Sequence, residues 1–282
     1  MISGAGGFLG KNLVKKLVAA GQQVACFYRD NKKNGSSSLI SYYQYGDSYK
    51  KVVRAITDFS PDVVIHTAAV YDPFLVDDLI GCNITLPLKM LEACKNVGNV
   101  HFIYMGSYWQ FGEAGTNNIP IDLYSASKLA FESMVDYYAI RKSVFSTELV
   151  LYGMYGENDA RHKLLDQLIY AAQNNLSLDL TKGEQYLNLL HVDDVSNAVI
   201  MVSKMLPKDI YHQKYCVSSE NEYTIKELVN KIEQYSRNKL NVNWGAMPYR
   251  ENEIFVPLYL YDSIPGWQET YMLDGYIVNY FK

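Results

Sequence analysis

Tyr124 and Lys128 are the residues whose types and spacing most directly suggest chemistry. Four residues apart on a helix they share one face, where an ammonium favours the phenolate and lowers a tyrosine pKa from about 10 toward working pH. A phenol placed in this way can donate a proton to the oxygen of a ketone that is being reduced. Ser107 follows an apolar run and could hydrogen-bond the same carbonyl, or simply satisfy the backbone of a turn.

The spacing of this pair is not unique, because the chain contains 25 tyrosines. Four Tyr-x-x-x-Lys matches occur: Tyr28/Lys32, Tyr124/Lys128, Tyr138/Lys142 and Tyr235/Lys239. By spacing alone each would be a surface pair, but only Tyr124 opens a helix shortly after an apolar run that ends in Ser107. Ligands of a parallel sheet collect at the carboxyl ends of its strands, so we expect Ser107 and Tyr124 to share one site.

A glycine-rich loop at positions 4–10 predicts a dinucleotide site. Its glycines recur every third residue before an amphipathic stretch, so the backbone can approach a pyrophosphate at the positive end of a helix. On the glycines alone, a turn without a ligand is an equal alternative. Arg29 stands where an acidic residue would accept the 2′-hydroxyl of an adenosine ribose, and arginine favours a 2′-phosphate. NADP(H) is therefore preferred and NAD(H) stays open, while Lys32 and Lys33 could add to the charge or form a solvated loop.

The elements that must hold these residues follow from the alternation of apolar runs with amphipathic stretches over about the first 150 residues. This pattern predicts an α/β fold with a doubly wound parallel sheet. We expect strands over 22–29, 62–69, 99–107 and 146–152. We expect helices over 8–20, 49–59, 79–96 and 124–142. Only Met1 to Ser3 precede the glycine loop, so the central strand is unusually short or a few native residues are missing.

Beyond residue 151 the alternation loosens, which indicates a second lobe. We expect a dinucleotide-binding domain over 1–152, to which 186–218 returns, and a smaller substrate-binding lobe over 153–185 and 219–282. Thr224 and Glu227 form a capping-box pattern that begins a helix reaching to about Tyr235. Asp193 and Asp194 are interpreted as capping another helix.

The bulk composition excludes several classes of function. With 26 basic and 30 acidic residues the net charge is −4, which argues against a nucleic-acid partner. Cysteines are scattered and the histidines lack ligand spacing, so we expect no metal and no disulfide frame. No apolar run approaches the roughly 20 residues of a membrane span, and no leader pattern is present, which predicts a cytoplasmic protein without membrane partners. His66 ends a buried-looking strand and is interpreted as structural.

Several motifs in register resemble the extended short-chain dehydrogenases, the NAD-dependent epimerase/dehydratase family. They follow the family's order along most of the chain: GAGGFLG at 4–10, Asp47 in YGD, HTAA at 66–69, Asn83, GSYWQFG at 106–112, YSASK at 124–128, LYGMYG at 151–156, HVDDV at 191–195, and Arg250 with Glu253. The resemblance implies an NAD(P)-dependent oxidoreductase with a nucleotide-sugar substrate.

The resemblance also implies residue roles. Tyr124 would be the catalytic acid/base, Lys128 would also hold the nicotinamide ribose, and Ser107 would assist. Asn83 would be a structural or proton-relay residue, and Asp47 would contact the adenine. The implied cofactor-binding residues are Gly4, Gly7, Phe8, Leu9, Gly10, Arg29, Asp47, Ala68, Tyr124 and Lys128.

Arg250 looks like the family's ligand for the diphosphate of the sugar nucleotide, which suits a guanidinium fork. Many members carry an arginine before HVDD and an asparagine before YG, where this chain has Leu187 and Gly153. Arg161 and Lys163 are therefore further candidates for substrate binding, with surface charge as the equal alternative.

Dehydratases of the family carry Asp-Glu after the serine position, where this chain has Tyr108-Trp109, so dehydration is disfavoured. GSYWQ, LYSASK and NDARHKLL look most like the branch of CDP-abequose and CDP-paratose synthases, which reduce 4-keto deoxyhexoses. We therefore expect a nucleotide-sugar 4-ketoreductase. A 4-epimerase with retained NAD is the first alternative, disfavoured by Arg29. A non-catalytic dinucleotide-sensing scaffold is the second, disfavoured because Tyr124 and Lys128 are both present. The family also implies a homodimer through the helices of 79–96 and 124–142.

Overall fold

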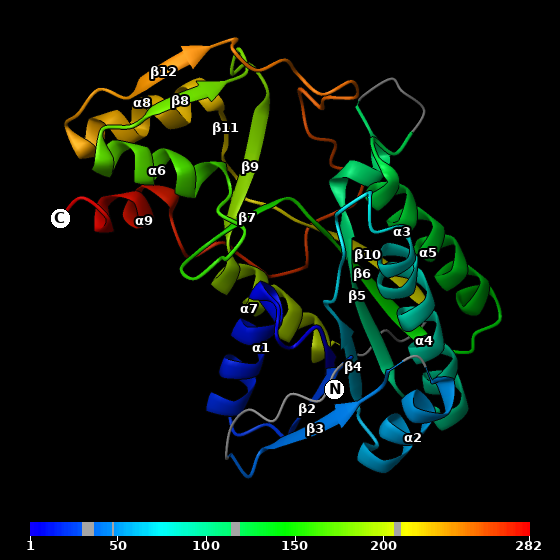
Figure 1. Cartoon of the computed structure of the whole chain (residues 1–282). Helices are drawn as coiled ribbons and strands as arrows, with labels where there is room; N and C mark the ends of the chain where they lie inside the picture. The colour runs from blue at the N-terminus through cyan, green and yellow to red at the C-terminus, as the bar shows by residue number, and fades with distance from the viewer. Residues whose placement is uncertain (30–36, 47, 114–118, 206–209) are drawn as a thin grey trace.

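A parallel sheet of seven strands forms the centre of the computed structural model, which describes residues 1–29, 37–46, 48–113, 119–205 and 210–282 (Figure 1). The strand order is β10-β6-β5-β4-β1-β2-β3, and every neighbouring pair is parallel. The strands are β1 (Ile2–Ser3), β2 (Val24–Tyr28), β3 (Ile40–Gln44), β4 (Val63–His66), β5 (His101–Ser107), β6 (Phe145–Leu151) and β10 (His212–Val217). The order reverses between β1 and β4, which is where ligands of doubly wound sheets bind. The predicted fold class is confirmed.

Helices cover both faces of this sheet because each buries one apolar stripe. One face carries α2 (Tyr49–Phe59), α4 (Leu86–Val97) and α5 (Leu123–Ile140). The other face carries α1 (Phe8–Ala19) and α7 (Val192–Ser203). Figure 1 shows these two layers on either side of the strands. Full burial of an aliphatic side chain such as Leu13 of α1 or Met90 of α4 stabilises the fold by about 1.5–3 kcal/mol.

The expected helix over 79–96 is interrupted, which corrects the sequence prediction. Helix α3 (Val76–Ile80) passes into a π-helical turn (Gly81–Thr85) before α4 begins. Asn83 lies in this turn, and its side chain bonds the backbone of Val70. The sequence pattern also missed β3, an edge strand whose residues are all partly or fully exposed. A half-exposed edge strand gives a weak apolar signal.

The second lobe packs around its own apolar core. It contains a sheet of β7 (Gly153–Tyr155), β9 (Tyr186–His191) and β11 (Glu222–Thr224), and a strand pair of β8 (Ser177–Leu180) and β12 (Asn241–Trp244). Its helices are α6 (Leu164–Asn174), α8 (Ile225–Ser236) and α9 (Leu273–Asn279). Both bonds of the capping box predicted at Thr224 and Glu227 are present. Within the segment 186–218, α7 and β10 lie with the large sheet, whereas β9 belongs to the second lobe.

Asp194 connects the two lobes. Its buried carboxylate accepts hydrogen bonds from Thr270 N at 3.0 Å, Thr270 Oγ1 at 2.5 Å and Tyr271 N at 2.8 Å. The N-cap of α7 is His191, whose Nδ1 accepts from the backbone of Asp193. The interpretation of Asp193 and Asp194 as helix caps is therefore wrong, because a histidine takes that position and Asp194 instead fastens the C-terminal segment.

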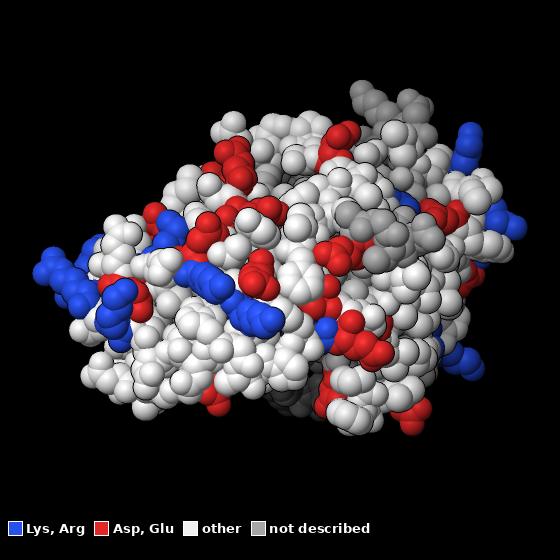
Figure 2. Space-filling model, turned by 90° about the horizontal axis from the view of Figure 1, so that it is seen from above, with Lys and Arg blue, Asp and Glu red and all other residues white. Residues whose placement is uncertain are grey.

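Acidic and basic side chains are interspersed over the face seen in Figure 2, rather than gathered by sign. Among the helices of the described ranges, none is both long and apolar enough to cross a bilayer.

Candidate active site

The glycine loop joins β1 to α1 at the point where the strand order reverses. Gly4 has a φ of 74°, and a Cβ there would come within 2.7 Å of the Ala68 Cα. A Cβ on Gly10 would come within 2.8 Å of the Ala5 Cα. Gly7 caps α1 without a side-chain hydrogen bond, and the first turn of α1 contains no acidic residue. The first N–H groups of α1 are thus free of side-chain caps, and the loop fits the pyrophosphate of a dinucleotide.

Three of the other predicted cofactor-binding residues adjoin this loop. Phe8 and Leu9 open α1, and Ala68 lies directly behind Gly4 in the segment that follows β4. Arg29 follows β2, is exposed, and pairs with Asp78 Oδ1 at 2.5 Å. Asp47 lies outside the described residues, as do Lys32 and Lys33.

Ser107, Tyr124 and Lys128 come together at the end of β5. Ser107 is the last residue of the strand, and α5 begins directly before Tyr124. Lys128 Nζ donates to the Met105 carbonyl oxygen at 3.0 Å and lies 5.7 Å from the centre of the Tyr124 ring. All three side chains are buried, with Tyr124 and Ser107 each 8% exposed. Asp122 fixes the start of α5, because its Oδ1 accepts the Ser125 N–H at 2.7 Å.

Burial dominates the ionisation of this group, which corrects one sequence expectation. Burial raises the pKa of Tyr124 well above its ordinary value, the neighbouring Tyr71 raises it further, and hydrogen bonding with Ser107 lowers it. Burial also lowers the pKa of Lys128 to about 8. The expectation that Lys128 brings the phenol pKa down toward working pH is therefore wrong in this structure. Tyr124 is a phenol rather than a phenolate at neutral pH.

Asn83 and His66 are structural neighbours of this group. Asn83 Nδ2 donates to the Val70 carbonyl oxygen at 2.9 Å and to Ser127 Oγ at 3.0 Å, so it ties the segment after β4 to α5. His66 is buried, and its Nδ1 is 2.7 Å from Ser3 Oγ. Burial, assisted by the charge of Lys128, lowers the pKa of His66 well below its ordinary value, so the ring is neutral.

Two aromatic residues that motif spacing did not assign to the site flank Tyr124. The Tyr71 ring lies 4.6 Å from the Tyr124 ring, centre to centre, and is 48% exposed. The Trp109 ring meets Tyr124 edge-on at 6.5 Å. Nothing in the sequence distinguished Tyr71 among 25 tyrosines. For Trp109, the one indication in the sequence was its position two residues after Ser107.

The three basic residues predicted to bind substrate lie in two places. The Arg250 guanidinium is 5.0 Å from the Trp109 ring centre and exposed. Arg161 lies 5.2 Å from the ring of Phe8, beside the glycine loop, and forms two hydrogen bonds with Asp159, at 2.6 and 2.5 Å. Lys163 Nζ donates to the Met154 carbonyl oxygen at 3.1 Å. Arg250 is thus placed near Tyr124 through Trp109. Arg161 lies between the dinucleotide loop and Tyr124, because it contacts Phe8 and hydrogen-bonds Tyr71, whose ring contacts Tyr124.

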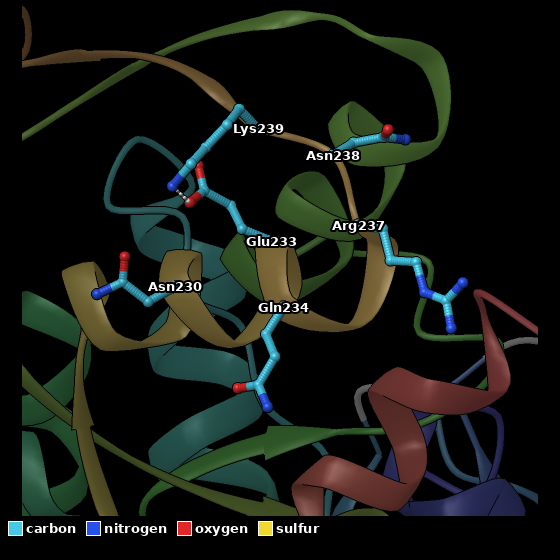
Figure 3. Close-up of a pocket in the computed structure, with 6 residues that line it drawn as sticks. All are labelled: Asn230, Glu233, Gln234, Arg237, Asn238 and Lys239. Atoms are coloured by element: carbon cyan, nitrogen blue, oxygen red, sulfur yellow. Dashed lines mark hydrogen bonds and ion pairs between the residues drawn. The ribbon is translucent and has the colours of Figure 1, made fainter.

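A surface recess on α8 is separate from this group (Figure 3). Its lining side chains are Asn230, Glu233, Gln234, Arg237, Asn238 and Lys239. Lys239 pairs with Glu233 at 2.5 Å, and none of the lining residues belongs to the predicted site.

Comparison with known proteins gives the same family as the motifs. The family model described as "NAD dependent epimerase/dehydratase family" matches residues 1–217. A CDP-abequose synthase of Yersinia pseudotuberculosis is 31% identical over 94% of this chain and 93% of its own length. A CDP-abequose synthase of Salmonella typhimurium is 26% identical over 90% of this chain and 87% of its own length.

Solved structures agree on the fold. MoeE5, solved with UDP-glucuronic acid and NAD, superposes with a TM-score of 0.83 at 18% identity, over 99% of this chain and 97% of that chain. The UDP-glucose 4-epimerase of Thermus thermophilus, solved with NAD, gives a TM-score of 0.79 at 21% identity, over the same shares. With its glycine loop, its Tyr-Lys pair and a family match over more than half its length, this chain belongs to the NAD dependent epimerase/dehydratase family.

Proposed function

We propose that this protein reduces the 4-keto group of a nucleotide-activated deoxyhexose, with NADPH as the preferred reductant. The observation that carries the proposal is the meeting of Ser107, Tyr124 and Lys128 beside a loop that fits a dinucleotide. Full-length similarity to proteins named CDP-abequose synthase supports the substrate class. The exposed Arg29 after β2 supports NADP(H), because a guanidinium recognises a 2′-phosphate.

In this reaction the bound dinucleotide would supply the hydride that forms the new C–H bond at C4. Ser107 hydrogen-bonds the ketone oxygen, and Tyr124 gives that oxygen its proton, so the carbonyl becomes an alcohol and the phenol a phenolate. A reductase needs Tyr124 protonated when substrate arrives, which its raised pKa favours. Lys128, held by the Met105 carbonyl, stabilises the phenolate left behind. Arg250 would bind the diphosphate, with the sugar beside Trp109.

The test follows NADPH absorbance during incubation with CDP- and UDP-linked 4-keto-6-deoxyhexoses, with NADH assayed in parallel. We expect Tyr124→Phe to lower turnover by about 10²- to 10⁴-fold, because proton donation is lost. Tyr138→Phe is the matched control, since Tyr138 and Lys142 repeat the same spacing on the same segment and Tyr138 OH bonds Glu92 instead. Unchanged turnover in Tyr124→Phe would contradict the catalytic assignment. Tightly retained NAD without net NADPH consumption would identify an epimerase instead.

A further inference from the structure

Gln110 makes three hydrogen bonds at the back of the site although its side chain is completely buried. Its Oε1 accepts the backbone N–H of Ser107 at 3.0 Å. Its Nε2 donates to Glu132 Oε2 at 2.7 Å and to Glu148 Oε1 at 2.9 Å. The side-chain amide of Gln110 therefore links the backbone of Ser107 to two buried carboxyl groups.

The two carboxyl groups come from different elements and differ in their partners. Glu132 lies on α5, four residues after Lys128, and forms an ion pair with Lys214 of β10. Glu148 lies on β6 and is fully buried, and its Oε2 has no hydrogen-bond partner among the described residues. Burial and then the charge of Glu132 raise the pKa of Glu148 to about 8, so it is a neutral acid at pH 7.

Each of the last three residues of β5 is held from a different side. The Met105 carbonyl receives Lys128, and the Ser107 N–H is bound by Gln110. Between them, Glu148 fills the space that a side chain on Gly106 would need, since a Cβ there would lie 3.0 Å from the Glu148 carboxyl carbon. An apolar side chain could fill the volume of Gln110, but only a side chain with an acceptor and donors can fix the Ser107 amide while satisfying both acids.

We propose that Gln110 is a positioning residue, and that Gln110, Glu132 and Glu148 form a buried frame that holds the end of β5 in the geometry the reaction needs. The frame acts on Ser107 directly and on Lys128 through Met105. This inference rests on the proposed function for its kinetic part, and on the complete burial of Glu148 for its dependence on pH. The ionisable groups that face Glu148 are Glu132 and Lys128 of α5, Lys214 of β10, Tyr104 of β5 and Tyr261 of the C-terminal segment.

The kinetic test replaces Gln110 with methionine, which keeps the length of the side chain and removes all three hydrogen bonds. We expect kcat to fall about tenfold or more while the KM for NADPH changes less than about twofold, because the dinucleotide loop is not touched. Gln234→Met, on the exposed face of α8, is the matched control and should keep wild-type kinetics. Wild-type kcat in folded Gln110→Met would overturn the positioning role. If that variant does not fold, Gln110→Met/Glu148→Leu removes the stranded acid, and the same loss of kcat is expected.

The second test uses Glu148→Gln and measures thermal unfolding without substrate. Because the folded protein keeps a proton that an unfolded glutamate releases above about pH 4.5, wild-type stability should decline as pH rises from about 4.5 to about 8. The melting temperature of Glu148→Gln minus that of wild type should therefore increase from about pH 4.5 to about pH 8. A difference in melting temperature that is the same at both ends would contradict the buried acid. If wild type shows no reductase activity, the proposed function fails, and this second test still decides whether Glu148 is a buried acid.

Discussion

Side-chain ionisation at the site is set by burial more than by neighbouring charge. Burial raises the pKa of Tyr124 and lowers that of Lys128, so both side chains are shifted toward their neutral forms. Such opposite shifts in adjacent residues are typical of sites where protons move, and they carry a cost in stability. The spacing of Tyr124 and Lys128 predicted their proximity correctly but not this effect, because burial depends on the elements that cover them.

Turnover should depend on pH through Lys128. Its pKa of about 8 means that the ammonium is present below about pH 8 and is lost above it. We expect kcat to fall as pH rises through about 8, because the phenolate of Tyr124 then loses the charge that stabilises it. Lys128→Met should be slow at every pH and should lack this fall. A wild-type kcat that stays constant between about pH 7 and 10 would contradict the role of the ammonium.

The same lowered pKa of Lys128 predicts that replacing the lysine raises stability, although it lowers activity. Both effects can be measured on the variant Lys128→Met. Folding lowers the pKa of Lys128 below its unfolded value of about 10.5, so the folded state is penalised below about pH 8 and the penalty disappears toward about pH 10.5. Lys128→Met should therefore unfold at higher denaturant concentration than wild type at pH 7, although it is less active.

At the scale of elements, the glycine loop makes a sharp prediction because its glycines are not equivalent. Gly10→Ala places a Cβ against the backbone of Gly4 and Ala5, so we expect a loss of stability and of NADPH binding. Gly6→Ala is the matched control within the same loop, since its Cβ would meet only the edge of the Tyr28 ring at 3.4 Å. Thermal unfolding and NADPH fluorescence report the two effects. Equal behaviour of both variants would show that the close packing of Gly10 does not matter.

Elements with a regular apolar periodicity or a short polar motif could be predicted from the sequence, and elements without either could not. The parallel sheet, α1, α2, α5 and the capping box of α8 followed from apolar periodicity and short polar motifs. The π-helical turn before α4 was missed because no residue type in Gly81–Thr85 marks a wider turn. Within the site, Ser107, Tyr124 and Lys128 were found because a motif places them on neighbouring elements. Tyr71 was not, because it reaches the site only when distant segments pack together. Gln110 lies only three residues after Ser107, in a Ser-x-x-Gln capping box that the motif reading did not use.

At the scale of the whole molecule, Asp194 decides how firmly the C-terminal segment is attached to α7. Asp194→Ala removes three hydrogen bonds to Thr270 and Tyr271, and we expect the free energy of unfolding to fall by about 3 kcal/mol. Asp193→Ala is the comparison, and a smaller loss is expected because the Asp193 carboxylate is part-exposed: it pairs with Lys16 at 3.2 Å, lies 4.0 Å from His191 Nδ1 and hydrogen-bonds the Tyr271 side chain. Denaturant unfolding measures both. Equal losses would contradict a special role for Asp194.

The predicted homodimer stays a prediction, and it concerns the outer surface of the layer that contains α4 and α5. Tyr137 and Ile140 of α5 are exposed on that layer, with Ile140 at 80%. The predicted division into a dinucleotide-binding domain and a substrate-binding lobe likewise stays a proposal about function. Its structural counterpart is a sheet with two covered faces and a second apolar core beside it.

The wider turn at Gly81–Thr85 has a consequence for comparing this chain with its relatives. Each residue of an α-helix advances the side-chain direction by about 100°, so one additional residue inside a turn rotates everything on one side of it relative to the other. A single-residue deletion here would restore regular helical geometry. It would also rotate the Asn83 amide away from the backbone of Val70, with which it forms two hydrogen bonds. Two sequences that differ by one residue in this segment should therefore be aligned by the faces of α3 and α4 and not by helix length.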